Sequence, residues 1–222
     1  MGGFFSIDGP FYRFGQRLLD LVIVGSIWTL FSLPIVTMGA TTTALYYVCT
    51  KKHSGDDVYI FKTFLKSFRE NFVKATIIFL ILVALGYFMW MNLHILGQID
   101  MGWLTIPVAV ALWFVLFQIA LVATNAFCLL SRFDITISLT LRYALFMGYR
   151  NFFTTISNWV TLLAIFLASV FVPEIIFLIG GVYVYFSSFS FLKLFRMHSA
   201  EFNGIVAELK GETLDDEENK NK

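Results

Sequence analysis

The chain has 222 residues, of which 58% are apolar and 14% are charged, with a formal net charge of +1. A soluble domain carries about 25% charged residues, so this composition argues against a soluble protein. The apolar stretches, such as residues 76–93, lack the alternation that a membrane β-barrel requires. The sequence therefore predicts an all-α, polytopic membrane helix bundle.

The first membrane segment is predicted at residues 18–33. Asp20 lies three residues after Arg17, and these side chains are expected to form a local ion pair at the interface. Pro34 ends the helix, because proline lacks a backbone donor and clashes with the preceding turn. Residues 35–50 are then expected to lead the chain back through the membrane. At about 1.5 Å per residue they are short for a hydrocarbon core of about 30 Å, so they form either a short span or a re-entrant helix.

A basic amphipathic helix is predicted at residues 58–72, with Asp56 or Asp57 as its N-terminal cap. Its apolar side chains recur at helical spacing on one face, and charged side chains occupy the other. The apolar face comprises Phe61, Phe64, Leu65, Phe68 and Phe72. Such a helix lies flat on an anionic leaflet, so we expect lipid headgroups rather than nucleic acid as the partner. The cations expected to face the lipid are Lys62, Lys66, Arg69, Arg142 and Arg150.

Further membrane segments are predicted at residues 73–91, 104–130, 152–172 and 175–195. Lysine and arginine are concentrated between these segments on one side, whereas the loop at residues 93–103 has none. The positive-inside rule places the basic connections in the cytoplasm. The expected topology is therefore six segments in the cell membrane with both termini cytoplasmic, or five if residues 35–50 are re-entrant.

One membrane domain is expected over residues 1–200. Residues 201–222 are polar and acidic, and we predict a disordered cytoplasmic tail. Cys49 and Cys128 fall at the ends of apolar segments and are expected to be free, buried thiols. Asp134 is expected to cap a helix in the basic connection before residue 150.

A weak internal repeat relates positions that are 80 residues apart. The matching pairs are Lys62 with Arg142, Leu65 with Leu145, Asn71 with Asn151, and Phe72 with Phe152. Each block reads as an interfacial helix, an Asn-Phe pair and a membrane segment. Four matches also arise by chance in amphipathic sequences, so the shared plan carries more weight than the identities. Asn71 and Asn151 are expected to serve structure rather than chemistry.

Residues 32–48 read SLPIVTMGATTTALYYV, and residues 59–81 read YIFKTFLKSFRENFVKATIIFLI. This pattern resembles the YesL family, a group of bacterial integral membrane proteins of unknown function, with the LPxxTxGA–TxAL block as its most specific part. An asparagine often stands in that family where this chain has Gly25. Family members are commonly encoded beside carbohydrate uptake systems, particularly ABC transporters. The resemblance thus implies a link to sugar import and supplies no catalytic residues.

The hairpin around Pro34 holds the densest polar group of the predicted membrane segments. Its notable residues are Pro34, Gly39, Thr41, Thr42 and Thr43. One interpretation is a broken-helix site near the midplane, where freed backbone groups meet a substrate or ion. The other, which we favour, is that the threonine hydroxyls bond to helix carbonyls while Gly39 permits close packing.

A second polar group comprises Gln118, Asn125 and Asn158, which are expected in the bundle interior. Gln118 and Asn125 are seven residues apart, on one helix face. Interhelical hydrogen bonds are the favoured use, and a transport path is the alternative. No charged side chain lies deep in a predicted span, which argues against a proton-driven transporter.

The sequence shows no nucleophile–base set, metal-ligand spacing or nucleotide motif, so we expect no enzyme, cofactor or metal. The leading hypothesis is a non-enzymatic membrane protein accessory to carbohydrate uptake or its regulation, which acts by contact with a transporter or regulator. The alternative is a membrane subunit of a transporter, ABC-type or other, that lines a substrate path. Residues 131–150 do not show the coupling segment typical of an ABC permease.

Overall fold

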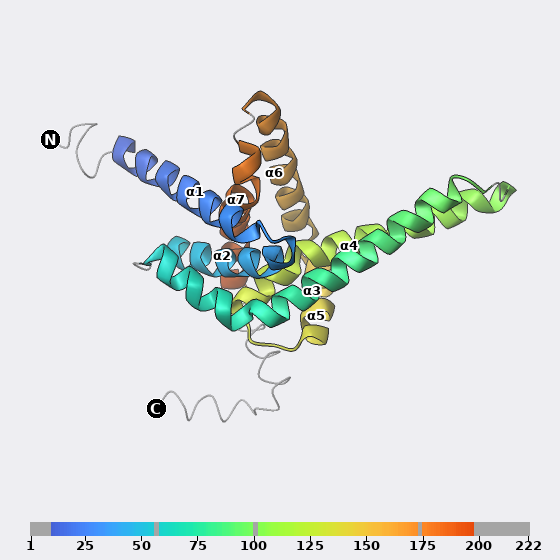
Figure 1. The fold of residues 1–222 in the computed structure, drawn as a ribbon, viewed down its shortest axis with the longest axis horizontal. Coiled ribbons are helices and arrows are strands. Elements are labelled where there is room, and N and C mark those ends of the chain that lie inside the picture. Colours follow the sequence, from blue (N-terminus) through green and yellow to red (C-terminus); the bar gives the residue numbers. More distant parts are fainter. Residues whose placement is uncertain (1–9, 56–57, 100–101, 173–174, 198–222) are drawn as a thin grey trace.

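The computed structural model describes residues 10–55, 58–99, 102–172 and 175–197, and every regular element in these ranges is helical. The proposed caps Asp56 and Asp57 and the acidic tail at 201–222 lie outside the described residues, as does the predicted domain boundary at residue 200. The elements are α1 (Pro10–Ser32), η1 (Ile35–Thr37), α2 (Met38–His53), α3 (Ile60–Leu96), η2 (Gly102–Leu104), α4 (Thr105–Arg132), α5 (Ile137–Arg150), α6 (Phe152–Phe171) and α7 (Ile175–Met197) (Figure 1).

Four helices, α3, α4, α6 and α7, are long and apolar enough to cross a membrane. The prediction of an all-helical, multi-pass membrane protein is therefore confirmed. The finer count of six segments does not follow from these helices. The apolar part of α1 spans only Leu18–Ser32, and α2 has 16 residues.

The chain breaks between α1 and α2 at Pro34, as the sequence predicted. Pro34 has extended backbone angles of φ −76° and ψ 110°. The Thr37 hydroxyl closes the turn by donating to the carbonyl oxygens of Phe31, at 2.5 Å, and Pro34, at 2.7 Å. The carbonyl groups freed at the end of α1 are thus satisfied by the side chain that follows the proline.

Helix α2 lies at the centre of the molecule, where α1, α3, α4 and α7 all contact it (Figure 1). Its length of about 24 Å is less than the hydrocarbon thickness of a bilayer. Its buried residues are Gly39, Ala40, Thr41, Thr43, Ala44, Leu45, Tyr46, Val48, Cys49 and Thr50. The second predicted segment is therefore a short helix enclosed largely by protein.

Glycines bring helices together at two contacts where an added side chain would collide with the neighbouring helix. A Cβ atom on Gly39 would lie 2.6 Å from the Ala75 carbonyl oxygen and 2.7 Å from the Phe79 Cβ atom, so α2 rests directly on α3. A Cβ atom on Gly181 of α7 would meet the Cα atom of Gly25 in α1. Small residues allow such close contact between membrane helices.

Helix α3 joins two elements that the sequence analysis separated. The amphipathic helix predicted at 58–72 and the span predicted at 73–91 form one helix of 37 residues, about 55 Å long. No proline or glycine stands between them, so nothing interrupts the hydrogen-bonded ladder. Of the predicted apolar face, Phe64 is buried and Leu65, Phe68 and Phe72 are half-buried, whereas Phe61 is 55% exposed. Phe31 of α1 contacts the rings of Phe64 and Phe68, with ring centroids 4.8 and 5.5 Å apart.

The internal repeat is not reproduced in the backbone. Asn71 lies inside the continuous helix α3, and its amide donates to the Ser67 carbonyl oxygen at 3.1 Å. Asn151 instead lies between two helices, α5 and α6, with φ −112° and ψ 46°. The predicted common plan is therefore wrong at this junction. The helix continues through Asn71 in the first block, whereas the backbone turns at Asn151 in the second block.

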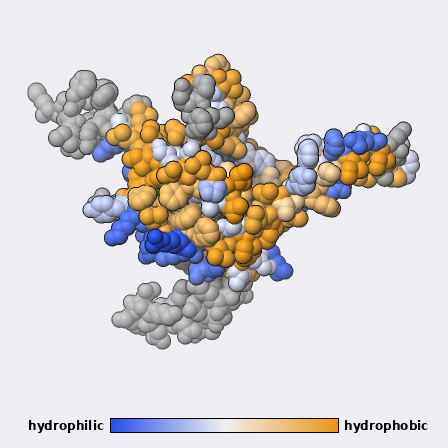
Figure 2. Space-filling view, in the orientation of Figure 1, coloured by the Kyte–Doolittle hydropathy of each residue, from blue (hydrophilic) through white to orange (hydrophobic). Residues whose placement is uncertain are grey.

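The long helices α3 and α4 run side by side as a hairpin that projects away from the other helices, while α6 and α7 project in a different direction (Figure 1). Figure 2 shows apolar residues over most of this face. Hydrophilic residues gather over the N-terminal half of α3 and again at the tip of the α3–α4 hairpin. Apolar walls between polar ends are the pattern of a protein that lies in a bilayer.

The contact at Gly39 generates a stability prediction. Gly39→Ala lowers the free energy of unfolding by about 1–3 kcal/mol, because the added methyl group overpacks α2 against α3. The measurement is an unfolding titration of the purified protein in detergent. The matched control is Gly86→Ala in α3, where an added Cβ meets nothing within 4 Å. Equal stability of the two variants would contradict the close packing of α2 on α3.

Candidate functional site

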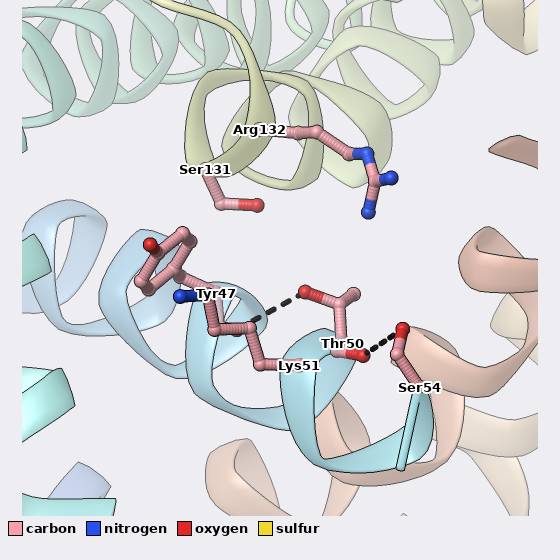
Figure 3. A pocket seen from close by; sticks show the side chains of 6 residues that line it. All are labelled: Tyr47, Thr50, Lys51, Ser54, Ser131 and Arg132. Carbon is pink, nitrogen blue, oxygen red and sulfur yellow. Dashed lines mark hydrogen bonds between the residues drawn. The ribbon is translucent and has the colours of Figure 1, made fainter. Parts of the chain in front are cut away.

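A polar pocket lies between the C-terminal ends of α2 and α4 (Figure 3). Its volume is about 380 Å³. The lining side chains are Tyr47, Thr50, Lys51 and Ser54 from the α2 side and Ser131 and Arg132 from α4. We call this the α2–α4 pocket.

Both cations of the α2–α4 pocket lie in the last turn of a helix or close to it. Helix C-termini carry partial negative charge, so Lys51 and Arg132 are favoured there. The Lys51 ammonium lies 4.9 Å from the centre of the Tyr47 ring, and the Arg132 guanidinium lies 5.3 Å from the centre of the Phe195 ring. These cation–π contacts orient the two side chains while both remain exposed.

Three hydroxyl groups of the pocket donate to carbonyl oxygens of their own helices. Thr50 Oγ1 donates to Tyr46 O at 2.7 Å, and Ser54 Oγ donates to Thr50 O at 3.0 Å. Ser131 Oγ donates to Cys128 O at 2.6 Å. With their protons engaged, these oxygens present lone pairs and act toward a ligand as acceptors.

A second polar pocket, of about 460 Å³, adjoins the first and shares Tyr47, Ser131 and Arg132 with it. It extends toward α3, where Glu70 and Asn71 contribute a carboxylate and an amide, and toward Asp134. The two pockets thus form a polar surface on the side of the molecule where the basic half of α3 lies.

Two ion pairs flank this region, and neither partner was predicted from the sequence. Asp20 pairs with Lys52, which joins α1 to α2. The Arg17 side chain, predicted to pair with Asp20, lies outside the described side chains. Asp134 pairs with Lys74 of α3 and does not cap α5, whose N-cap residue is Thr136. Both acids therefore find partners far along the chain, because the helix ends meet only after folding.

The three consecutive threonines of α2 differ in their surroundings. Thr41 Oγ1 donates to the Phe31 carbonyl oxygen at 3.2 Å, and Thr42 Oγ1 accepts from Trp28 Nε1 at 3.2 Å. Thr43 is fully buried, and its hydroxyl has no partner. The close contact of Gly39 with α3 agrees with the packing role that the sequence favoured. The expected bonds from the threonine hydroxyls to carbonyl groups of their own helix are not formed at these three positions, since only Thr41 donates to a carbonyl oxygen and that oxygen belongs to α1.

The structure does not join the three predicted interior amides. Asn125 Nδ2 donates to the Leu121 carbonyl oxygen of its own helix at 2.7 Å, and its side chain faces Gly148 of α5. Gln118 Oε1 and Asn158 Nδ2 are buried without a hydrogen-bond partner. The interhelical hydrogen bond between α4 and α6 is instead made by Trp159 Nε1, which donates to Thr124 Oγ1 at 2.8 Å.

The polar contacts between α2 and α7 were not predicted from the sequence. The Tyr46 hydroxyl lies 2.8 Å from Ser187 Oγ, and His53 Nδ1 lies 3.2 Å from Ser188 Oγ. Cys49 is buried nearby, and like Cys128 it is a free thiol, as predicted. The only sequence signal for these contacts was the serine pair in an otherwise apolar segment.

The predicted lipid-facing cations, Lys62, Lys66, Arg69, Arg142 and Arg150, are all exposed. They lie on α3 and α5, away from the lining of the α2–α4 pocket. Within the described ranges, no group of three or more His, Cys, Asp or Glu residues is placed to hold a metal ion. The α2–α4 pocket presents two cationic side chains, Lys51 and Arg132, beside the hydroxyl oxygens of Thr50, Ser54 and Ser131.

Residues 21–93, which include α2 and most of α1 and α3, match the family described as "Protein of unknown function, DUF624". It is the domain family found in YesL-like bacterial membrane proteins, so the resemblance seen in the sequence is confirmed. Comparisons with curated proteins and with solved structures returned no match. The matched segment supplies Lys51 and its neighbours, whereas Ser131 and Arg132 lie outside it.

The two ion pairs differ in burial, so we expect their removal to lower the free energy of unfolding by different amounts. The Asp20 side chain is 15% exposed, whereas that of Asp134 is 86% exposed. Asp20→Asn is expected to lower the free energy of unfolding by about 2 kcal/mol, because it removes a charge-assisted hydrogen bond from a partly buried site. Asp134→Asn should cost less than about 1 kcal/mol. Unfolding titrations in detergent compare the two, and a larger loss for Asp134→Asn would refute this ranking.

Proposed function

We propose that this chain is a non-enzymatic protein of the cell membrane that is accessory to carbohydrate uptake or its regulation. It acts by lateral packing against a transporter subunit or regulator. Both termini lie in the cytoplasm, and the basic half of α3 faces the anionic inner leaflet.

The observation that carries the proposal is the open α3–α4 hairpin. Only 17% of the apolar window of α3 and 6% of that of α4 are buried inside the chain. Large side chains along α4 are exposed, including Ile106 at 73%, Val110 at 63% and Trp113 at 65%. A hairpin that packs on so little of its own chain leaves both helices available to a neighbour in the bilayer.

A second apolar surface supports the same role. A groove of about 670 Å³ runs along α6 and is closed on one side by Phe186 of α7. Small side chains, among them Ser157, Ala164 and Ala168, line it. Small residues at such a surface let a second transmembrane helix approach closely.

The carbohydrate link rests on the family resemblance, because YesL-like proteins are commonly encoded beside sugar import systems. The cytoplasmic placement rests on charge. Lys62, Lys66 and Arg69 lie on one half of α3, whereas the predicted loop at the other end of the helix has no lysine or arginine.

A second candidate function is a transporter subunit that lines a substrate path. The observation that favours it is the pair of buried, unpartnered amide atoms, Gln118 Oε1 in α4 and Asn158 Nδ2 in α6. Buried polar groups without partners are costly, and a passing hydroxylated substrate would satisfy them.

Orientation is tested by cysteine labelling, since both native cysteines are buried. Gln98→Cys, at the tip of the α3–α4 hairpin, should react with a membrane-impermeant maleimide on intact cells. Ser138→Cys, an exposed position on α5, should react only after the cells are opened. Labelling of Ser138→Cys on intact cells would refute the proposed orientation.

The accessory role is tested by photo-crosslinking in cells of the native host. A crosslinking residue at Trp113 on α4 should capture a component of a carbohydrate import system, and deletion of the gene should reduce uptake of the corresponding sugar. The matched control is a crosslinker at the buried position Leu121 of the same helix, which should capture little. Unchanged uptake together with no captured import component would reject the role. Sugar transport by liposomes that hold only this chain would instead establish the second candidate.

A further inference from the structure

We propose that the second polar pocket binds a primary ammonium group. This pocket lies where α2, α3 and the end of α4 meet, and we call it the three-helix pocket. Primary ammonium groups occur in free amines and in the headgroup of phosphatidylethanolamine. The volume of about 460 Å³ lies within the range of small-molecule sites, about 300–1,000 Å³. The proposal concerns a ligand site and does not depend on the accessory role proposed above.

Glu70 supplies the negative charge of the three-helix pocket. It is an exposed residue of α3 that lines the pocket. Within the described ranges, no ion pair or hydrogen bond engages its carboxylate, whereas the Asp134 carboxylate, also in the lining, is paired with Lys74. An ammonium ligand gives Glu70 a charge-assisted hydrogen bond, which is stronger than a hydrogen bond between neutral groups.

Two neutral oxygen atoms provide further acceptors. The Nδ2 atom of Asn71 donates to the Ser67 carbonyl oxygen at 3.1 Å, so the Oδ1 atom is left to accept. Ser131 Oγ donates to Cys128 O at 2.6 Å, and its lone pairs accept. Figure 3 shows this hydroxyl directed into the space between α4 and α2. An ammonium group has three N–H donors and no acceptor, so Glu70, Asn71 and Ser131 match it in kind and in number.

The end of α4 also favours a cation. Helix α4 ends at Arg132, and the carbonyl groups of its last turn carry partial negative charge. The same partial charge disfavours an anion, so a phosphate or a carboxylate is a poor ligand here. A neutral hydroxylated ligand can donate to the oxygen atoms but gains little from the charge of Glu70.

Two cations of the protein near the three-helix pocket are held apart from its acceptors. The Arg132 guanidinium lies 5.3 Å from the centre of the Phe195 ring in α7, and Figure 3 shows it directed away from Ser131. Lys51 lines the α2–α4 pocket but not the three-helix pocket. The Glu70 carboxylate is therefore left to a ligand.

The three-helix pocket lies at the level of lipid headgroups. In α3, Glu70, Asn71 and Lys74 come directly before residues 75–93, which include no charged residue. In α4, the lining residues lie at the end of a long apolar helix. Charged and polar residues at the ends of apolar helices mark the membrane interface. The headgroup of a membrane lipid thus reaches the pocket without leaving the bilayer.

The first experiment uses the full chain in detergent and measures binding by calorimetry. The probes are ethanolamine, choline and ethylene glycol. Choline carries the positive charge but has no N–H donor, and ethylene glycol lacks the charge. Ethanolamine should bind about tenfold more tightly than either, because only ethanolamine offers charge-assisted N–H donors.

Native mass spectrometry tests the lipid source. It compares retention of phosphatidylethanolamine with that of phosphatidylcholine of the same acyl chains, which differs only in the methyl groups on nitrogen. Phosphatidylethanolamine should be retained in preference. Loss of this preference in Glu70→Gln assigns it to the three-helix pocket.

Three variants locate the site. Glu70→Gln should weaken ethanolamine binding about tenfold, because it removes a charge-assisted hydrogen bond. Arg132→Gln should tighten ethanolamine binding about twofold, because it removes a like charge at the pocket, whereas an anion site would respond in the opposite direction. The control, Lys62→Gln, changes an exposed residue of α3 that lines neither polar pocket and should not weaken binding. Thermal unfolding verifies that each variant is folded.

Binding of ethanolamine that depends on Glu70 supports the proposal with a soluble source. Preferential retention of phosphatidylethanolamine alone, with the same dependence, supports it with a lipid source. The proposal is overturned if neither ethanolamine nor phosphatidylethanolamine binds in preference to its methylated counterpart. It is also overturned if ethylene glycol binds as well as ethanolamine, or if Glu70→Gln binds as wild type does.

Discussion

The close contact of α2 with α3 at Gly39 is the constraint on which the rest of the structure depends. Because Gly39 has no side chain, the start of α2 lies against the Ala75 carbonyl group, and the helix sits deep enough for α4 and α7 to reach it. Its polar atoms are then largely satisfied from within, by bonds such as that from Thr41 to Phe31 O and that between Tyr46 and Ser187. A short helix enclosed in this way needs no full membrane span of its own.

Enclosure of α2 also explains where the polar chemistry gathers. Its first half is packed by glycine, alanine and threonine, so polar side chains with solvent or headgroup contact are confined to its last turn. There it meets the end of α4, and the cations that suit a helix C-terminus come together from both helices. The α2–α4 pocket is thus a by-product of two helices ending at the same level.

Much of the fold was predictable because long apolar stretches of sequence indicate membrane helices. The break at Pro34, the amphipathic face of residues 58–72 and the free cysteines followed from local patterns. The partners of Asp20 and Asp134 did not, because nearest charges along the sequence are poor guides when helix ends converge. The continuity of α3 was missed for a related reason, since a change from amphipathic to uniformly apolar sequence marks a change of surroundings rather than a break in the backbone. The pocket was not predicted because Lys51 and Arg132 are about 80 positions apart in the sequence. Each of them, taken alone, looks like a cation that stabilises a helix C-terminus.

Helix α3 runs without a break from its basic half into its apolar half. The first half carries Lys62, Lys66 and Arg69, and the second half forms one side of the projecting α3–α4 hairpin. A helix without a proline or glycine at the junction transmits tilt with little bending. The direction of the basic half of α3 and the direction of the α3–α4 hairpin are therefore fixed relative to each other by one helix, which contacts α2 where Ala75 meets Gly39.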